Sequence, residues 1–104
     1  MPHITIDDRT ATEIFPGIDL RTFWGEKMML SVADLAPGAK LPPHSHPHEQ
    51  AGVILSGQLT LNIADEERVL GPGDIYIAEG GVEHSGQAGQ DGCRALDIFS
   101  PVRE

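Results

Sequence analysis

The sequence predicts an all-β fold in one small domain, and three observations support this prediction. The chain has 104 residues, which is enough for one hydrophobic core. Its 12 glycines and 8 prolines divide it into pieces of about five to nine residues, the spacing typical of a β-sandwich or β-barrel. No segment of helical length has an apolar repeat of about 3.6 residues. We therefore expect a small antiparallel β-barrel over residues 1–104.

The first half of the chain predicts an edge strand, a hairpin and a strand that follows a proline-rich stretch. Residues 4–15 fit either a short helical turn or an edge strand, and we favour the edge strand. Residues 17–24 alternate between apolar and polar side chains, as a half-buried strand does. A turn at Gly25-Glu26 leads to a returning strand at 27–35, and the next clear strand covers residues 50–55.

In the second half, glycines mark the points where we expect strands to end. Ser56-Gly57 is predicted to end the strand of residues 50–55, and Asp65-Glu66-Glu67 is predicted to form a hairpin turn. The glycine-rich residues 89–92 are interpreted as a flexible link. The expected strands are residues 58–64, 68–70, 75–78, 84–88 and 93–99. Tyr76, like Trp24 in the first half, is interpreted as a core residue.

Strand alternation predicts which side chains near residue 50 face the interior. If Gln50 points inward, Gly52, Ile54 and Ser56 do so as well. The outer face of this strand then carries the apolar side chains between them, Ala51, Val53 and Leu55. Such a face needs a cover, which the N-terminal strands or a second copy of the chain could supply. We favour the second copy and expect a homodimer.

Composition and charge exclude several classes of protein. Sixteen acidic residues against seven basic ones give a net charge of −9, which would repel a phosphate backbone, so we expect no nucleic-acid partner. The apolar runs are far shorter than the roughly 20 residues needed to cross a bilayer. The first residues have no basic and apolar leader pattern, so we expect a cytoplasmic protein. The single Cys93 is interpreted as a small buried residue.

Three of the five histidines lie within residues 44–48 and predict a metal site. Imidazole is the commonest protein ligand of first-row divalent metals. On an extended backbone His44 and His46 point the same way, and a return strand would bring His84 alongside them. The fourth ligand is open at this point between Gln50, Glu49 and His48, because Pro47 can disturb the alternation.

The glycine and histidine spacing resembles the two motifs of the cupin family. The first motif, about residues 38–57, is matched by Gly38, His44, His46, Gln50 and Gly57. The second motif, about residues 73–88, is matched by Gly73, Gly81 and His84. The resemblance implies one cupin domain with a jelly-roll barrel, and the pattern favours Gln50 as the fourth ligand.

The sequence departs from the cupin pattern at three positions. Gln50 stands where Glu is commonest, Glu79 stands where Pro is usual, and Ala88 stands where Asn is often found. The last two are framework positions. At the first, a neutral amide oxygen in place of a carboxylate leaves the site more positive, which makes the metal a sharper Lewis acid and lowers its affinity somewhat.

A narrower resemblance connects the chain with the pectin-degradation cupins, which open the ring of 4,5-unsaturated uronate monosaccharides. It rests on the His-x-His-x-x-x-Gln spacing of residues 44–50, on His84 and on the final stretch of residues 96–104. It implies that His44, His46, Gln50 and His84 hold the metal. It also implies that Asp97 transfers a proton, Arg103 pairs with the substrate carboxylate and Phe99 shapes the pocket.

The expected function is therefore metal-assisted ring opening or tautomerisation of an unsaturated sugar acid or a similar small anionic carbohydrate. Two other functions fit the same ligands: a metal-dependent dioxygenase, and a non-catalytic module that binds metal or a small molecule. The expected cofactor is one divalent transition metal ion, and nickel, zinc, iron, manganese and copper all suit these ligands.

Overall fold

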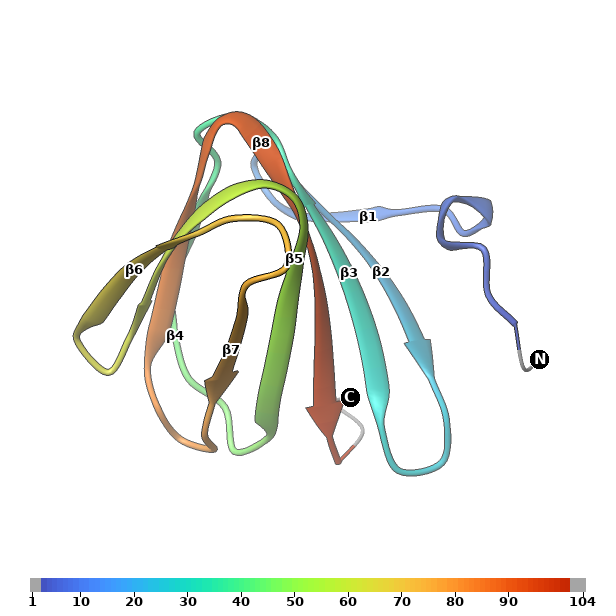
Figure 1. Ribbon diagram of the computed structural model, residues 1–104. Coiled ribbons are helices and arrows are strands. Elements are labelled where there is room, and N and C mark those ends of the chain that lie inside the picture. Colours follow the sequence, from blue (N-terminus) through green and yellow to red (C-terminus); the bar gives the residue numbers. More distant parts are fainter. Residues whose placement is uncertain (1–2, 102–104) are drawn as a thin grey trace.

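A computed structural model describes residues 3–101 as one short 3₁₀ helix and eight strands whose pairings are all antiparallel (Figure 1). The helix η1 covers Ile6–Asp8, and the strands are β1 Thr12–Phe15, β2 Ile18–Trp24, β3 Met29–Leu35, β4 Lys40–His44, β5 Glu49–Ile63, β6 Glu66–Leu70, β7 Ile75–Ala78 and β8 His84–Ser100. The predicted all-β fold is confirmed. No helix in this part of the chain is long and apolar enough to span a membrane.

Two long strands, β5 and β8, form the centre of the fold and pair along their whole length, from Glu49 opposite Ser100 to Ile63 opposite His84. The first half of β5 also pairs with β7, and its second half pairs with β6. The first half of β8 pairs with β4, and its second half pairs with β3, followed outward by β2 and β1. The long strands therefore belong to both walls of the barrel (Figure 1).

Two predicted strand ends were wrong. We expected one strand to end at Ser56-Gly57 and another to end before residues 89–92, but each of these points lies inside a long strand. The β5–β8 ladder continues past both points, with register shifts between Ile54 and Ser56 and between Gly57 and Leu59. Gly57 and Gly92 both have positive φ, and a Cβ on Gly57 would overlap the Gly92 carbonyl. The glycines thus allow two backbones to approach where both strands bend, which is the usual role of a bulge.

The hairpin after β5 turns one residue earlier than the sequence predicts. Ala64 and Asp65 have φ of 50° and 66°, as the two central residues of a tight hairpin turn require. Glu66 and Glu67, which we expected in the turn, lie in β6 and pair with Ile63 and Asn62. Strand β6 therefore begins earlier than the predicted strand of residues 68–70.

Residues 4–15 contain both of the alternatives that the sequence offered. The helical turn is η1, and the edge strand is β1, which pairs only with β2. The sequence did not indicate β4, because Pro42 and Pro43 weaken a strand pattern. Its ladder with β8 is irregular between Leu41 and His44, where the prolines lie, and β8 is its only partner among the described strands. Proline is tolerated on such an edge strand.

The core lies between the two walls of the barrel, and the predicted alternation of β5 is largely confirmed. Gln50, Gly52 and Ile54 are buried, while Ser56 is exposed because the bulge after Ile54 shifts the alternation. The main core cluster consists of Ile18, Leu35, Ile54, Leu59, Leu61, Ala88, Cys93 and Ala95. Cys93 is buried as expected, and burial raises the pKa of its thiol to about 11.

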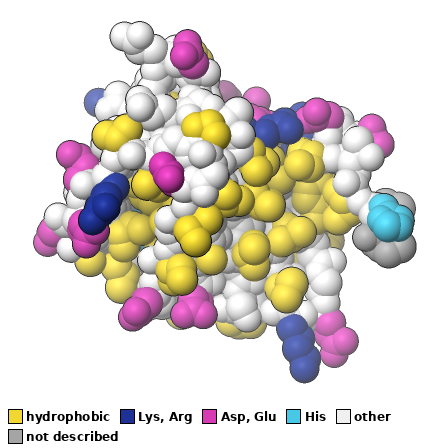
Figure 2. Space-filling model, in the orientation of Figure 1, with side chains coloured by type: hydrophobic (Ala, Val, Ile, Leu, Met, Phe, Trp, Pro, Cys, Tyr) yellow, Lys and Arg dark blue, Asp and Glu magenta, His cyan; other side chains and the backbone are white. Residues whose placement is uncertain are grey.

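The outer face of β5 continues into an apolar surface, which we call the β5–β7–β8 face. It carries Leu55 and the exposed isoleucines Ile75, Ile77 and Ile98. Ile77 and Ile98 lie on either side of Ala51 in the sheet. Figure 2 shows hydrophobic side chains gathered over this region. The N-terminal strands β1 and β2 lie beyond β3 at the far edge of the sheet, so they do not cover this face.

Candidate metal centre

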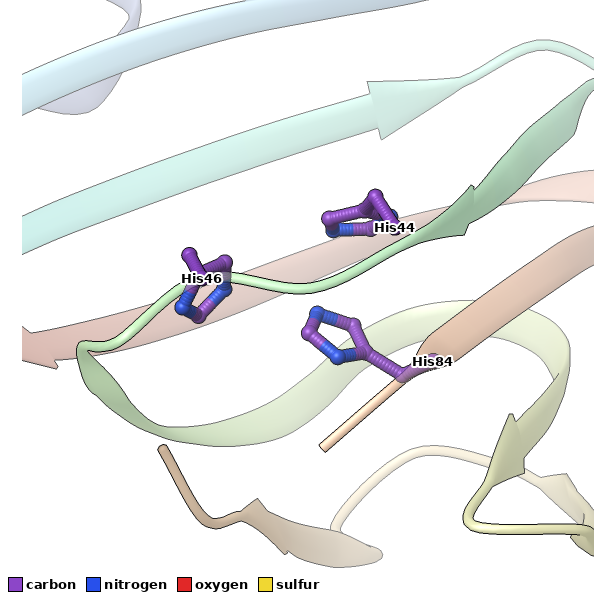
Figure 3. Close-up of side chains that lie close together, drawn as sticks. All are labelled: His44, His46 and His84. Atoms are coloured by element: carbon purple, nitrogen blue, oxygen red, sulfur yellow. The ribbon is translucent and has the colours of Figure 1, made fainter. Parts of the chain in front are cut away.

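Three histidines from separate segments converge at one end of the barrel. His44 ends β4, His46 lies in the loop before β5, and His84 begins β8. Figure 3 shows their rings turned toward one another. One ligand nitrogen from each ring can be chosen so that all three lie within 4.8 Å of one another. The return strand that we expected to bring His84 alongside is β8, where His84 pairs directly with His44.

Backbone carbonyls fix the protonation of the three rings. The Nδ1 atoms of His44, His46 and His84 lie 2.9, 2.9 and 3.0 Å from the carbonyl oxygens of Pro42, His48 and Val82. A carbonyl oxygen only accepts, so each Nδ1 must donate, which leaves the lone pair of the neutral ring on Nε2. This arrangement orients imidazole ligands in many metal sites.

Gln50 completes a donor set that suits a cation. Its Oε1 lies 3.0 Å from His46 Nε2, and the Gln50 amide also hydrogen-bonds to the Asp97 carboxyl. The amide nitrogen donates to Asp97, so the amide oxygen faces His46. With Nδ1 of His46 already donating, two acceptor atoms meet at this distance. A metal ion between them removes the repulsion, and the residues present therefore fit a divalent transition metal.

The two alternatives for the fourth ligand lie apart from this donor set. Glu49 is exposed and precedes the inward-facing Gln50 on β5, so its side chain lies on the outer face. The centroid of the His48 ring lies 5.8 Å from that of His46, and His48 does not belong to the cluster of three ligand nitrogens. Gln50 is the side chain that the fold brings to the triad.

Asp97 lies directly behind the triad and is buried with Tyr76. The Tyr76 hydroxyl donates to the Asp97 carboxylate. Burial raises the pKa of Asp97 to about 6, although hydrogen bonds from Tyr76 and Gln50 act in the opposite direction. Burial and the nearby Asp97 charge raise the pKa of Tyr76 well above its usual value. A carboxyl group with this pKa can both accept and donate a proton near neutral pH.

Gly52 makes room for this pair of side chains. It pairs with Tyr76 on one side and with Asp97 on the other, and a Cβ on Gly52 would overlap the Tyr76 ring and the Asp97 carboxylate. Gly52→Ala is therefore expected to lower the free energy of unfolding by about 1–3 kcal/mol, as overpacking does. Thermal melts measure the loss. Gly25→Ala is the matched control, since nothing lies within 4 Å of that position. Equal melting temperatures for the two variants would contradict this packing.

The three residues that the resemblance assigns to catalysis have different outcomes. Asp97 and Phe99 share the inner face of β8, and the Phe99 ring centroid lies 5.6 Å from that of His46. Arg103 lies outside the described residues. Arg94, the other late arginine, is held by Asp34 at 2.7 Å and Asp7 at 2.8 Å. Its charge is thus already matched by these carboxylates.

A cavity of about 770 Å³ opens beside the triad. One end is polar and includes His44, Gln50 and Asp97. The remainder is lined mainly by apolar side chains of β1, β2 and β3, and Phe99 belongs to the lining. A small molecule in this cavity would therefore contact the carboxyl group of Asp97 and the metal ligands together.

Sequence reasoning interpreted Tyr76 and Trp24 as core. Tyr76 does pack against the core cluster, but its contact with Asp97 was not predicted, and the core prediction for Trp24 was wrong. Tyr76 contacts Asp97, and Trp24 lines the cavity with 63% of its surface exposed. The signal for Tyr76 was present in the alternation of β7. Ile75 and Ile77 are exposed, which places Tyr76 on the inner face between them.

The cupin domain family model matches residues 31–99, a segment that includes the histidine triad, Gln50 and Asp97. The chain belongs to the cupin family. This cupin is similar to the pectin degradation protein KdgF of Dickeya dadantii (strain 3937), with 33% identity over 101 residues, 94% of this chain and 92% of that protein. It is also similar to the germin-like protein subfamily T member 3 of Arabidopsis thaliana, with 36% identity over 93 residues, which cover 83% of this chain but 39% of that protein.

A solved structure of KdgF from Halomonas sp. superposes on this cupin with a TM-score of 0.88. The two chains are 27% identical, and the match covers 94% of this chain and 91% of the Halomonas chain. The resemblance to cupins, and to the pectin-degradation cupins in particular, is therefore confirmed. The triad gives this cupin three imidazole donors for a metal, the kind of ligand that first-row divalent metals favour.

Proposed function

We propose that this cupin is a metal-dependent enzyme that converts a cyclic unsaturated uronate into a linear keto acid. The observation that carries the proposal is the buried Asp97 carboxyl, which is held by Tyr76 and lines the same cavity as His44 and Gln50. The similarity to KdgF over nearly the whole chain supports the same reaction class. When bound, the metal would supply Lewis acidity and polarise a substrate oxygen.

The proposed reaction needs one residue that can move a proton. The proton leaves the hydroxyl group on C1, the bond between C1 and the ring oxygen breaks to give an aldehyde and an enolate, and a proton adds to C4 as the enolate becomes a ketone. Atoms balance without a further reactant. Asp97 accepts the first proton and returns one to C4, while the hydrogen bonds from Tyr76 and Gln50 hold its carboxylate in place.

The remaining contacts would orient the substrate. His44, His46, His84 and Gln50 would hold the metal, with the carbonyl contacts at Nδ1 setting the ring orientations. Phe99 would form one wall of the pocket, which its place beside the His46 ring supports. Arg103 would pair with the substrate carboxylate, as the resemblance implies.

The test of this proposal is turnover by the metal-loaded protein. Purified protein is first analysed for bound elements, then loaded with nickel, zinc, iron, manganese or copper and mixed with an unsaturated uronate monosaccharide. We expect the absorbance of the C4–C5 double bond to fall and NMR to show the linear keto acid. Consumption of oxygen with iron or copper, and none with zinc, would favour the dioxygenase instead. Retained metal without turnover of any uronate would favour a binding module.

We also infer that this cupin is a homodimer that buries the β5–β7–β8 face. Ile75 and Ile77 are 73% and 63% exposed on the single chain, which is unusual for isoleucine. Ile77→Glu is expected to weaken the dimer about 100-fold or more, because it would bury an unpaired charge. Analytical ultracentrifugation measures this, with Met28→Glu as a control, because Met28 is 53% exposed and lies in the β2–β3 turn, away from the face. A monomeric wild type would contradict the inference.

A further inference from the structure

Trp24 occupies an unusual position for the one tryptophan of the chain. It ends β2 and lies on the same inner face as Leu20 and Thr22, which also line the cavity beside the triad. Its partner across the hairpin, Met29, is buried, yet Trp24 keeps 63% of its surface exposed. A large aromatic side chain on an inner face that stays exposed has surface left to contact a ligand.

The cavity that Trp24 lines has two chemically different parts. Its polar part contains His44, Gln50 and Asp97, and its other part is lined by apolar side chains such as Ile18 and Leu41. A ligand that fits both parts carries oxygen atoms at one end and presents carbon-bound hydrogens along its side. A small ring has this shape, because its faces carry C–H groups while its hydroxyl and carboxylate oxygens lie at the rim.

Arg9 holds the indole from the N-terminal segment. Its guanidinium carbon lies 5.5 Å from the centroid of the Trp24 ring and 4.8 Å from that of Phe23, and its Nη1 donates to the Thr22 carbonyl at 2.8 Å. The Arg9 carbonyl in turn accepts a hydrogen bond from Arg21 Nε at 2.6 Å. A cation against the ring favours one orientation of the indole, so the aromatic surface is pre-organised before a ligand arrives.

We propose that Trp24 is a substrate-binding residue of this cupin: its indole contacts the C–H face of a small ring-shaped ligand whose oxygen atoms point to the histidine triad. This inference rests on the proposed function for the choice of an unsaturated uronate as the ligand. Trp24 sets the affinity for the ligand, while the proton transfer belongs to Asp97.

The single tryptophan gives a direct test that does not depend on turnover. Because all tryptophan emission comes from Trp24, quenching of this emission by acrylamide measures access to this one side chain. The metal-loaded protein is titrated with an unsaturated uronate monosaccharide, and we expect the quenching constant to fall at least twofold as the ligand covers the indole. Turnover of the uronate with unchanged quenching would overturn the role of Trp24 and leave the enzyme proposal intact.

Protection without turnover would have the opposite meaning, since it would support the contact with Trp24 and contradict the enzyme proposal. Neither protection nor turnover with the metal-loaded protein would overturn both. The two readouts therefore separate the failure of this inference from the failure of the proposed function.

Three variants of the same hairpin provide the kinetic test. Trp24→Ala is expected to raise KM at least tenfold and to change kcat less than twofold, because a contact made equally in the ground and transition states affects binding alone. Trp24→Phe keeps an aromatic face and should raise KM only about threefold. Met28→Ala is the control, since Met28 is 53% exposed and does not line the cavity. Equal KM values for Trp24→Ala and Met28→Ala would overturn the proposal.

Discussion

Asp97→Asn is expected to reduce turnover of an unsaturated uronate by about 10²–10⁴-fold, the usual contribution of a positioned acid or base. Asparagine has nearly the shape of aspartate, and its carbonyl oxygen can still accept the hydrogen bond from Tyr76. It cannot take up or release the proton that the ring opening transfers. Steady-state kinetics measure the loss, which should lie in kcat as well as in kcat/KM.

The controls for this variant separate lost chemistry from lost structure. Elemental analysis should show that Asp97→Asn keeps its metal, because Gln50 and the three histidines are unchanged. Asp19→Asn carries the same substitution at an exposed position of β2 and should retain full activity. If Asp97→Asn is as active as wild type while Tyr76 and Gln50 are intact, Asp97 has no part in the mechanism.

Local periodicity predicted those strands that turn signals bound on both sides. Residues 75–78 were predicted as β7 with the observed bounds, and β2 and β3 lie within the predicted residues 17–24 and 27–35. Residues 17–24 alternate in polarity, the other two segments are short and largely apolar, and a glycine or proline follows each of them within two residues. The information needed to place them is therefore contained in a few neighbouring residues.

The bends of the long strands could not be predicted in the same way. Gly57 looks like the end of a strand when β5 is considered alone, and Gly92 looks like part of a flexible link when β8 is considered alone. In the fold Gly57 lies against the Gly92 carbonyl and Gly92 lies against the Leu35 carbonyl, so each missing side chain allows a neighbouring backbone to approach. Whether a glycine ends a strand or bends it depends on its partner across the sheet, which one sequence does not contain.

The residues of the site likewise include some that the sequence predicted and some that it did not. The spacing of His44 and His46 predicted two imidazoles on one side of the backbone, and the fold brings His84 to them. Tyr76 packs against the core as predicted, and only its contact with Asp97 was missed. Trp24 was missed because large aromatic residues are usually buried, and a general preference for burial cannot distinguish a packed ring from one that lines a cavity. The alternation of side chains along β2 and β7 shows which aromatic residues face the interior, provided that every residue of the strand is assigned to a face.

Removing the metal is expected to lower the melting temperature of this cupin strongly. A ligand present at about 1,000 times its dissociation constant stabilises the folded state by about 4 kcal/mol. In a domain of this size each kcal/mol corresponds to about 4–8 °C, so a fall of roughly 15–30 °C is expected. Calorimetry before and after chelation at neutral pH measures it.

Two histidine variants show whether this effect belongs to the triad. His46→Gln removes a triad nitrogen and should lose the metal, melt near the chelated wild type and respond little to further chelation. His48→Gln changes a neighbouring ring that is not part of the triad and keeps the carbonyl that orients His46, so it should retain the metal. An unchanged wild-type melt after elemental analysis confirms metal removal would contradict a tight site. Equal metal loss in both variants would contradict the assignment of the ligands, because His46 belongs to the triad and His48 does not.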